Sequence, residues 1–108
     1  MIYEYRAYTV APGKMNDLFN RFRNHAIPLF ERHGIKPIAF FTPVIAEASN
    51  QLIFILEFKD LAHRESAWAG FMADEDWKKA FVESHKDGEL VISVENKILA
   101  PTDFSPLG

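Results

Sequence analysis

The start of the chain carries three side chains whose types and spacing could do chemistry together. Glu4, Arg6 and Tyr8 alternate along a strand-like stretch, so they point to one face of a strand in steps of about 7 Å. Arg6 could hold the carboxylate of a ligand through two hydrogen bonds, and Tyr8 could donate a third. Alternatively, these groups form structural ion pairs, either with each other or with Glu95 and Lys97 across a subunit interface, which is the commoner use of such residues.

The histidines and the aromatic side chains are the other candidates. The spacing of the four histidines matches no compact ligand motif, so we expect no metal site. His25 suits a cleft best, because a kink caused by Pro28 frees backbone carbonyls near it. We expect no cofactor, since no dinucleotide, P-loop or HExxH motif is present. Aromatic residues at helical spacing form either core or, less commonly, a ligand pocket: Trp68, Phe71, Trp77 and Phe81.

The composition favours one packed domain. The chain has 108 residues, of which 48% are hydrophobic, and its formal net charge is −3. This charge and the scattered lysines and arginines argue against a nucleic-acid partner. The absence of cysteine excludes thiol chemistry and fits a reducing compartment. No apolar run approaches the roughly 18 residues of a membrane span, and the charged start resembles no signal peptide, so we expect a cytoplasmic location.

Strand and helix patterns alternate along the chain. The predicted elements are a strand over Ile2–Val10, a helix from Met15 to Phe30 bent near Asn24, strands over 35–45 and 51–58, a helix capped by Asp60, a second helical segment from Asp74, and a strand over Glu89–Ala100. The order β-α-β-β-α-β predicts an α+β fold of the ferredoxin-like type. In this fold two helical layers cover one face of a four-stranded antiparallel sheet.

Period-2 alternation divides each strand into two sets of side chains. The set expected to face the helices comprises Tyr3, Tyr5, Ala7, Thr9, Leu52, Phe54, Leu56, Phe58, Leu90, Ile92, Val94 and Ile98. The other set, which includes Glu4, Arg6 and Tyr8, mixes aliphatic groups with charges of both signs. It is too apolar to face water and too charged for an ordinary core. Two sheets facing each other would cover this set, so we expect a homodimer with paired charges between the sheets.

Four motifs together indicate a known family. They are "YEYRAYTVAPGK" at 3–14, "FKDLAHRESA" at 58–67, "WKKAF" at 77–81, and the closing pattern of Leu99, Pro101, Thr102, Phe104, Ser105 and Pro106. The chain resembles the NIPSNAP family of the dimeric α+β barrel superfamily over essentially its whole length. This resemblance implies one domain over residues 1–108 and a homodimer whose two sheets form a closed barrel. It implies no established common reaction.

The last eight residues, 101–108, are predicted to form a packed C-terminal extension. Pro101 ends strand pairing, and Phe104 offers an apolar ring that a solvated tail would not need. We expect Phe104 to dock on the helices of its own chain or on a partner subunit.

Three functions remain open from the sequence. The first is a homodimer that binds a small, partly apolar, acidic molecule in the barrel or in the cleft between helices and sheet, using Glu4, Arg6, Tyr8, His25 and Glu95. The second is a cofactor-independent enzyme, either a monooxygenase or an isomerase or lyase, by analogy of fold. In that case Glu4 or His25 would be the base and Tyr8 the acid. The third is a protein-interaction module.

Overall fold

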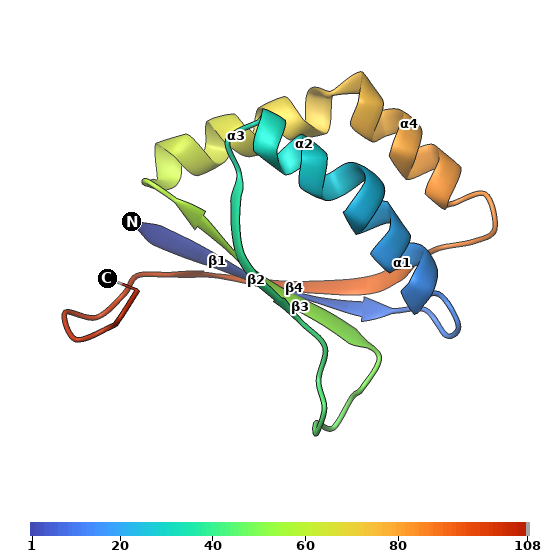
Figure 1. The fold of residues 1–108 in the computed structure, drawn as a ribbon, viewed down its shortest axis with the longest axis horizontal. Coiled ribbons are helices and arrows are strands. Elements are labelled where there is room, and N and C mark those ends of the chain that lie inside the picture. Colours follow the sequence, from blue (N-terminus) through green and yellow to red (C-terminus); the bar gives the residue numbers. More distant parts are fainter. Residues whose placement is uncertain (108) are drawn as a thin grey trace.

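Strands and helices alternate in the computed structural model, which describes residues 1–107 (Figure 1). In chain order the elements are β1 (Ile2–Val10), α1 (Met15–Arg21), the π-helical turn η1 (Phe22–Ala26), α2 (Ile27–Arg32), β2 (Lys36–Phe41), β3 (Gln51–Phe58), α3 (Leu61–Ala73), α4 (Glu75–Ser84) and β4 (Val91–Leu99). This order confirms the predicted β-α-β-β-α-β arrangement. Within residues 1–107, no helix combines the length and the hydropathy needed to cross a bilayer.

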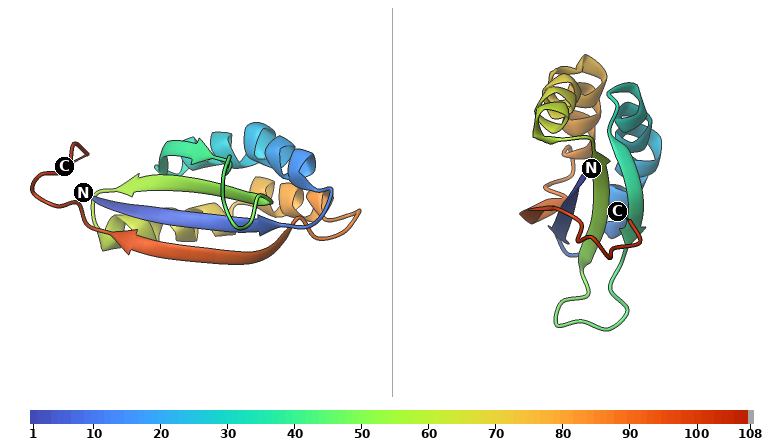
Figure 2. Two further views of the ribbon diagram at one scale, coloured as in Figure 1. Left: turned by 90° about the horizontal axis from the view of Figure 1, so that it is seen from below. Right: turned by 90° about the vertical axis from the view of Figure 1, so that its left-hand side faces the viewer.

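The strands form one antiparallel sheet in the order β2-β3-β1-β4. Both helical connections lie on the same face of this sheet, and the other face is bare (Figures 1 and 2). The fold is therefore α+β and ferredoxin-like, as predicted. Strand β2 ends at Phe41, four residues before the predicted end, because Pro43 cannot donate to a strand ladder. The loop 42–50 projects away from the sheet.

The first helical segment on this face is a bent rod made of α1, η1 and α2. The bend lies at the predicted position, where Ile27 donates to the carbonyl of Phe22, five residues earlier. Pro28 follows directly and has no N–H for the regular ladder, which accounts for the local widening of the helix. The rod ends at Gly34, whose positive φ of 73° is strained for other residue types.

The second helical segment consists of α3 and α4, and each helix begins at a predicted cap. The Asp60 carboxylate accepts from the backbone N–H of His63 at 2.8 Å. The Asp74 carboxylate accepts in the same way from Asp76 at 2.9 Å. Such caps satisfy donors that the first helical turn leaves free and contribute about 1 kcal/mol each. The Asp60 cap fixes where α3 starts, and hence which side chains of α3 face the sheet.

The core lies between the helices and the sheet. On β3, the predicted core side chains Leu52, Phe54, Leu56 and Phe58 are all buried. Phe54 makes edge contacts with Phe22 at 5.3 Å and with Tyr8 at 5.2 Å between ring centroids. The buried members of the core are Val10, Leu18, Phe22, Ala26, Leu29, Phe30, Ile35, Leu52, Phe54, Leu56, Phe58, Ala67, Phe71 and Leu90.

The predicted orientation of β1 is wrong. Glu4 pairs with Leu56, Arg6 with Phe54 and Tyr8 with Leu52 across the β1–β3 ladder. Directly paired residues point to the same face, so the three polar side chains face the helices with the core of β3. Alternation defines two sets on a strand but not which set is inside. The charge of Glu4 favoured the exposed face of the strand. Hydrogen-bond donors from α3 and β4 nevertheless allow it to lie inside.

The prediction for β4 is correct from residue 93 onward. Val94 and Ile98 share the helix side with Asn96, because these residues pair with Tyr8, Glu4 and Arg6 of β1. A register shift at Val10 then brings Val91, rather than Ile92, into contact with the core. The opposite side of β4 carries Ser93, Glu95, Lys97 and Leu99, whose partners on β1 are Thr9, Ala7, Tyr5 and Tyr3.

The bare face of the sheet combines apolar and aromatic side chains with polar and charged ones. Its residues, placed by the ladders, are Tyr3, Tyr5, Ala7, Thr9, Lys36, Ala39, Phe41, Gln51, Ile53, Ile55, Glu57, Ser93, Glu95, Lys97 and Leu99. The tail contacts this face at one end, where the Tyr3 hydroxyl donates to the carbonyl of Leu107 at 2.6 Å. Phe104 is 84% exposed, so the prediction that it docks on its own helices is wrong. Its docking on a partner subunit stays a prediction.

Candidate functional site

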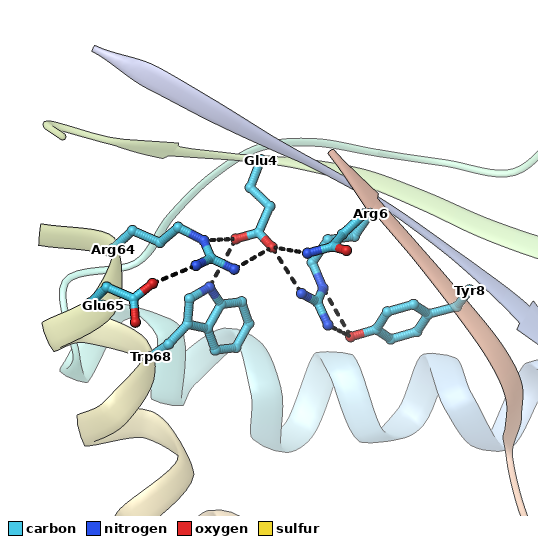
Figure 3. A network of polar contacts seen from close by, with 7 residues as sticks. Glu4, Arg6, Tyr8, Arg64, Glu65 and Trp68 are labelled. Carbon is cyan, nitrogen blue, oxygen red and sulfur yellow. Dashed lines mark hydrogen bonds and ion pairs between the residues drawn. The ribbon is translucent and has the colours of Figure 1, made fainter. Parts of the chain in front are cut away.

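A single buried carboxylate organises the polar residues between helices and sheet (Figure 3). Glu4 has no exposed surface and accepts five hydrogen bonds. Its Oε1 receives Arg64 Nε and Trp68 Nε1, both at 2.9 Å. Its Oε2 receives Arg6 Nη1 at 2.9 Å, Arg64 Nη2 at 3.1 Å and Asn96 Nδ2 at 3.2 Å. Both oxygens are therefore saturated with donors, which allows a charge to lie in the core.

Two opposing effects determine the acidity of this carboxylate. Burial alone would raise the pKa of Glu4, because it disfavours the charged form. Hydrogen bonds from Arg64, Trp68 and Asn96, together with the charge of Arg6, outweigh burial and lower the pKa of Glu4 to about 2. Glu4 is consequently ionised at neutral pH and has no free lone pair with which to take a proton from a substrate.

The local sequence explains why these partners meet. Arg64 and Trp68 are four residues apart on α3, so they lie on one helix face, and the Asp60 cap fixes the position of that face along the sheet. Asn96 is the direct partner of Arg6 in the β1–β4 ladder. Three elements thus contribute to one network around a strand that lies next to the sheet edge.

Arg6 is held by Glu4 on one side and is only loosely bonded on the other. Its Nε and Nη2 lie 3.4 and 3.3 Å from the Tyr8 hydroxyl, at the long end of hydrogen-bond distances. The guanidinium carbon lies 5.0 Å from the Trp68 ring centroid, within the range of a cation–π contact. The Arg6 side chain is 18% exposed, so water reaches it.

Two exposed aliphatic side chains flank Asn96, the partner of Arg6 on the edge strand. Val94 and Ile98 point to the helix side but remain 50% and 41% exposed. The helix layer therefore leaves this part of β4 uncovered. We call Arg6, Tyr8, Trp68, Val94 and Ile98 together the Arg6 site. It combines a cation, a phenol, an aromatic face and exposed aliphatic surface.

The structure brings together three of the five predicted site residues. Glu4, Arg6 and Tyr8 form one network, whereas His25 and Glu95 lie elsewhere. His25 is exposed on the outer side of the bent helix, where it lines an open groove of about 870 Å³ between this helix and α4. Glu95 projects from the bare face of the sheet and lies 3.5 Å from Lys97.

Sequence reasoning missed several members of the network. Arg64 and Asn96 were not predicted, and Trp68 was expected only as an aromatic residue of the core or of a ligand pocket. The spacing of Arg64 and Trp68 was a usable signal, since two donors four residues apart on a helix can serve one acceptor. Nothing in the local sequence marks Asn96, because its role depends on the β1–β4 register.

The histidines lie in separate environments. His33 Nε2 is 2.7 Å from Asp74 Oδ2. His63 accepts from the backbone N–H of Lys59, and His85 contacts the carbonyl of Phe81. Within residues 1–107, no three histidine, aspartate or glutamate side chains gather closely enough to hold a metal ion.

The comparison with protein families decides the identity of the domain. The NIPSNAP family model matches residues 3–106. The chain belongs to the NIPSNAP family. A NIPSNAP family structure from Agrobacterium tumefaciens is 30% identical with a TM-score of 0.87, over 99% of this chain and 98% of that one. Another from the same organism, described as having unknown function, is 30% identical with a TM-score of 0.86, over 100% of this chain and 94% of that one.

Animal NIPSNAP proteins are more distant in sequence. Mouse NipSnap homolog 3B is 26% identical over 80 residues, which cover 74% of this chain and 32% of the mouse protein. NipSnap homolog 3A from Pongo abelii is 24% identical over 82 residues, or 76% of this chain and 32% of that protein. The matched region is about a third of the length of these curated relatives.

Proposed function

We propose that this NIPSNAP domain binds a small, partly apolar acid at the Arg6 site, and that it does so as a homodimer. One observation carries the proposal: Arg6 is anchored by Glu4 while its remaining N–H groups make only long contacts to Tyr8, next to exposed Val94 and Ile98. A carboxylate is the group that matches this unused guanidinium edge in geometry and charge.

The anchoring of Arg6 favours binding over a purely structural role. Because Glu4 and the Trp68 ring already fix the guanidinium, a ligand would lose little freedom in ordering it. The ligand carboxylate would replace the weak Tyr8 contacts at Nε and Nη2. The Tyr8 hydroxyl would then donate to the same carboxylate. The aliphatic or aromatic part of the ligand would cover Val94 and Ile98 and remove their apolar surface from water.

The same geometry argues against the enzymatic alternative that uses Glu4 as base. A carboxylate with five donors and a pKa of about 2 accepts protons poorly at neutral pH. The other proposed base, His25, lies on the outer side of the helical layer and outside the Glu4 network. A binding role therefore accounts for the arrangement of these residues better than proton transfer does.

The homodimer is proposed from the bare face of the sheet. Ile53 and Ile55 lie on this face in the central strand β3, and Phe41 and Leu99 on the outer strands are 53% and 41% exposed. A sheet face that exposes several large apolar side chains in this way is normally covered. A second copy offers the same surface with Glu95 and Lys97, whose opposite charges can pair across a two-fold axis.

Fluorescence of Trp68 provides the test of ligand binding. A Trp77→Phe background leaves Trp68 as the reporting indole, and phenylacetate is titrated against its neutral counterpart phenylacetamide. We expect a saturable change with phenylacetate, a response to phenylacetamide at least about tenfold weaker, and loss of the phenylacetate response in Arg6→Met. Arg23→Met, at an exposed position outside the Arg6 site, is the matched control. Equal responses to acid and amide, or an unchanged response in Arg6→Met, would contradict the proposal.

A further inference from the structure

A second arginine, Arg21 on α1, is buried without a charged partner. Arg21 as a whole residue is only 7% exposed. Its Nε is the one buried side-chain nitrogen or oxygen within residues 1–107 that has no hydrogen-bond partner. Over the same residues, no carboxylate forms an ion pair with it. Removing a guanidinium from water is costly unless an anion compensates the charge.

The contacts that Arg21 does make are weak ones. Its Nη1 donates to the Ser84 hydroxyl at 3.3 Å. The guanidinium carbon lies 5.4 Å from the Trp77 ring centroid and 5.6 Å from that of Phe81. Burial lowers the pKa of Arg21, and the nearby Tyr8 hydroxyl opposes this. An arginine nevertheless keeps its charge at neutral pH, so these rings and one hydroxyl offset only part of the lost hydration.

Arg21 and Ser84 open onto a second groove between the bent helix and α4, smaller than the groove described above at His25. The groove has a volume of about 290 Å³, which is near the lower end of the roughly 300–1,000 Å³ found for small-molecule sites. Nearly all of its lining residues have polar side chains: Asp17, Asn20, Arg21, Asn24, His25, Ala80, Glu83, Ser84, Lys86 and Asp87. None of these residues belongs to the Glu4 network, so the groove is distinct from the Arg6 site.

The charged side chains of the groove fall into a buried zone and an exposed zone. Arg21 is the deeply buried cation, while Asp17 and Asp87 are exposed carboxylates. Glu83 is already bound by Lys86 at 2.7 Å. A multiply charged anion such as phosphate would be attracted by Arg21 but repelled by the two aspartates. A molecule with one negative and one positive end is complementary to both zones.

We propose that this groove binds a small zwitterion of the amino-acid type. Its carboxylate accepts from Arg21, and its ammonium group points to Asp17 and Asp87. The Ser84 hydroxyl donates to the carbonyl of Phe81 at 2.9 Å in the free protein and would turn to donate to the ligand carboxylate instead. The amides of Asn20 and Asn24 offer further donors and acceptors around it. Binding completes the hydrogen bonds of the Arg21 guanidinium with a charged acceptor, which rings and a neutral hydroxyl do not provide.

Amide NMR on the ¹⁵N-labelled 108-residue chain tests the proposal with defined probes. The twenty amino acids are titrated one by one, beside acetate, phosphate and ethanolamine. We expect at least one amino acid to give saturable shifts in residues 17–25 and 80–87 at about millimolar concentration. We expect acetate, which lacks the ammonium group, to bind at least about tenfold more weakly, and ethanolamine and phosphate to give no saturable shift. Saturation by phosphate or acetate at the same concentration would overturn the assignment of a zwitterion.

Variants separate binding from packing. Arg21→Met keeps the aliphatic contact with Trp77 and should abolish the amino-acid shifts, whereas Arg23→Met, an exposed arginine outside the groove, should leave them intact. Ser84→Ala removes a single hydroxyl and serves if Arg21→Met does not fold; it should weaken binding about three- to tenfold. The absence of localised saturable shifts for all twenty amino acids in the wild-type protein would overturn the proposal without reference to any variant. The Arg6 site could fail its own test without affecting this result.

Discussion

The Arg64 guanidinium binds both oxygens of Glu4, with Nε 2.9 Å from Oε1 and Nη2 3.1 Å from Oε2. This two-point contact connects α3 to β1 and orients the carboxylate so that Oε2 also receives Arg6. A buried carboxylate is stabilised only when its lone pairs find donors, and a paired arginine is the geometric match for it. Glu4 is thus the structural anchor of the Arg6 site rather than its reacting group.

Replacement of Glu4 by glutamine should destabilise the fold. The variant removes the negative charge, so that Arg6 loses its anion and Arg64 keeps only its ion pair with Glu65, at 2.8 Å. We expect a loss of about 2–4 kcal/mol, somewhat below the ~3–5 kcal/mol for a fully buried pair, because both guanidiniums keep some contact with water. Urea unfolding measures the change. Glu89→Gln, at an exposed position before β4, is the control and should cost less than about 0.5 kcal/mol. Equal stabilities for the two variants would refute the anchoring role.

Stability should fall in acid because of two carboxylates. The pKa of Glu4 is lowered to about 2 from its usual 4.5. A hydrogen bond from His33, joined by the backbone of Asp76 and by Arg32, lowers the pKa of Asp74 to about 2. A depressed folded-state pKa stabilises the fold above the unfolded-state value, and the stabilisation is lost as the pH falls toward the folded-state value. We therefore expect unfolding free energy to decrease between pH 4.5 and about 2.

Urea titrations at several pH values between 5 and 2 check this, with ranges set by the pKa values above. Glu4→Gln should show a shallower decrease than wild type, since it lacks one of the two groups. Asp74→Asn keeps a helix-capping side chain and should also be shallower, through the second group. An identical pH dependence in wild type and Glu4→Gln would mean that the carboxylate does not titrate as described.

The order of elements was predictable from the sequence because it depends on local patterns. Aspartates at helix starts, Pro28 inside a helical stretch and Gly34 at its end all act on the backbone near them, and each marks a feature found in the structure. Alternation on β3 also identified Phe54 and its neighbours as core. Which side chains of β1 join this core depends on the register of the β1–β3 ladder, and the sequence of β1 alone does not specify that register.

The candidate site was only partly predictable because its partners are distant in sequence. The prediction that Arg6 and Tyr8 act together is consistent with their contact, but the face on which they lie was assigned incorrectly. Glu4 lies 60 residues from Arg64 and 92 from Asn96 along the chain. A pattern read along one strand contains no information about donors at such separations, and so a charged side chain was assigned to the outside.

The C-terminal extension offers a graded test. Deletion of residues 101–108 should lower the Tm or weaken the dimer. Tyr3→Phe removes only the hydrogen bond to Leu107 and should cost about 1 kcal/mol, or roughly 4 °C in Tm. Phe104→Ser should leave the unfolding of an isolated chain unchanged, because the ring is exposed there, but should weaken the dimer if the ring docks on a partner. An unaltered melting curve and dimer after the deletion would show that the tail does not pack.

A charge on the bare sheet face should dissociate the proposed dimer. Ile55→Lys places an ammonium group at the centre of the face, next to Tyr5 across the ladder. We expect the dimer Kd to rise roughly 30-fold or more, with an unchanged circular dichroism spectrum. Val82→Lys, at a position 70% exposed on α4, is the control and should leave the dimer intact. Sedimentation velocity measures both. A dimer that tolerates Ile55→Lys would place the interface elsewhere.

Native mass spectrometry of the 108-residue chain with a mixture of small carboxylic acids tests the central claim most directly. We predict that wild type and Arg23→Met each capture one acid per subunit, that neutral amides of the same acids are not captured, and that Arg6→Met forms the same oligomer but captures none. Equal capture by Arg6→Met and wild type, or no capture by wild type, would contradict the assignment of Arg6 as the residue that binds an acidic ligand.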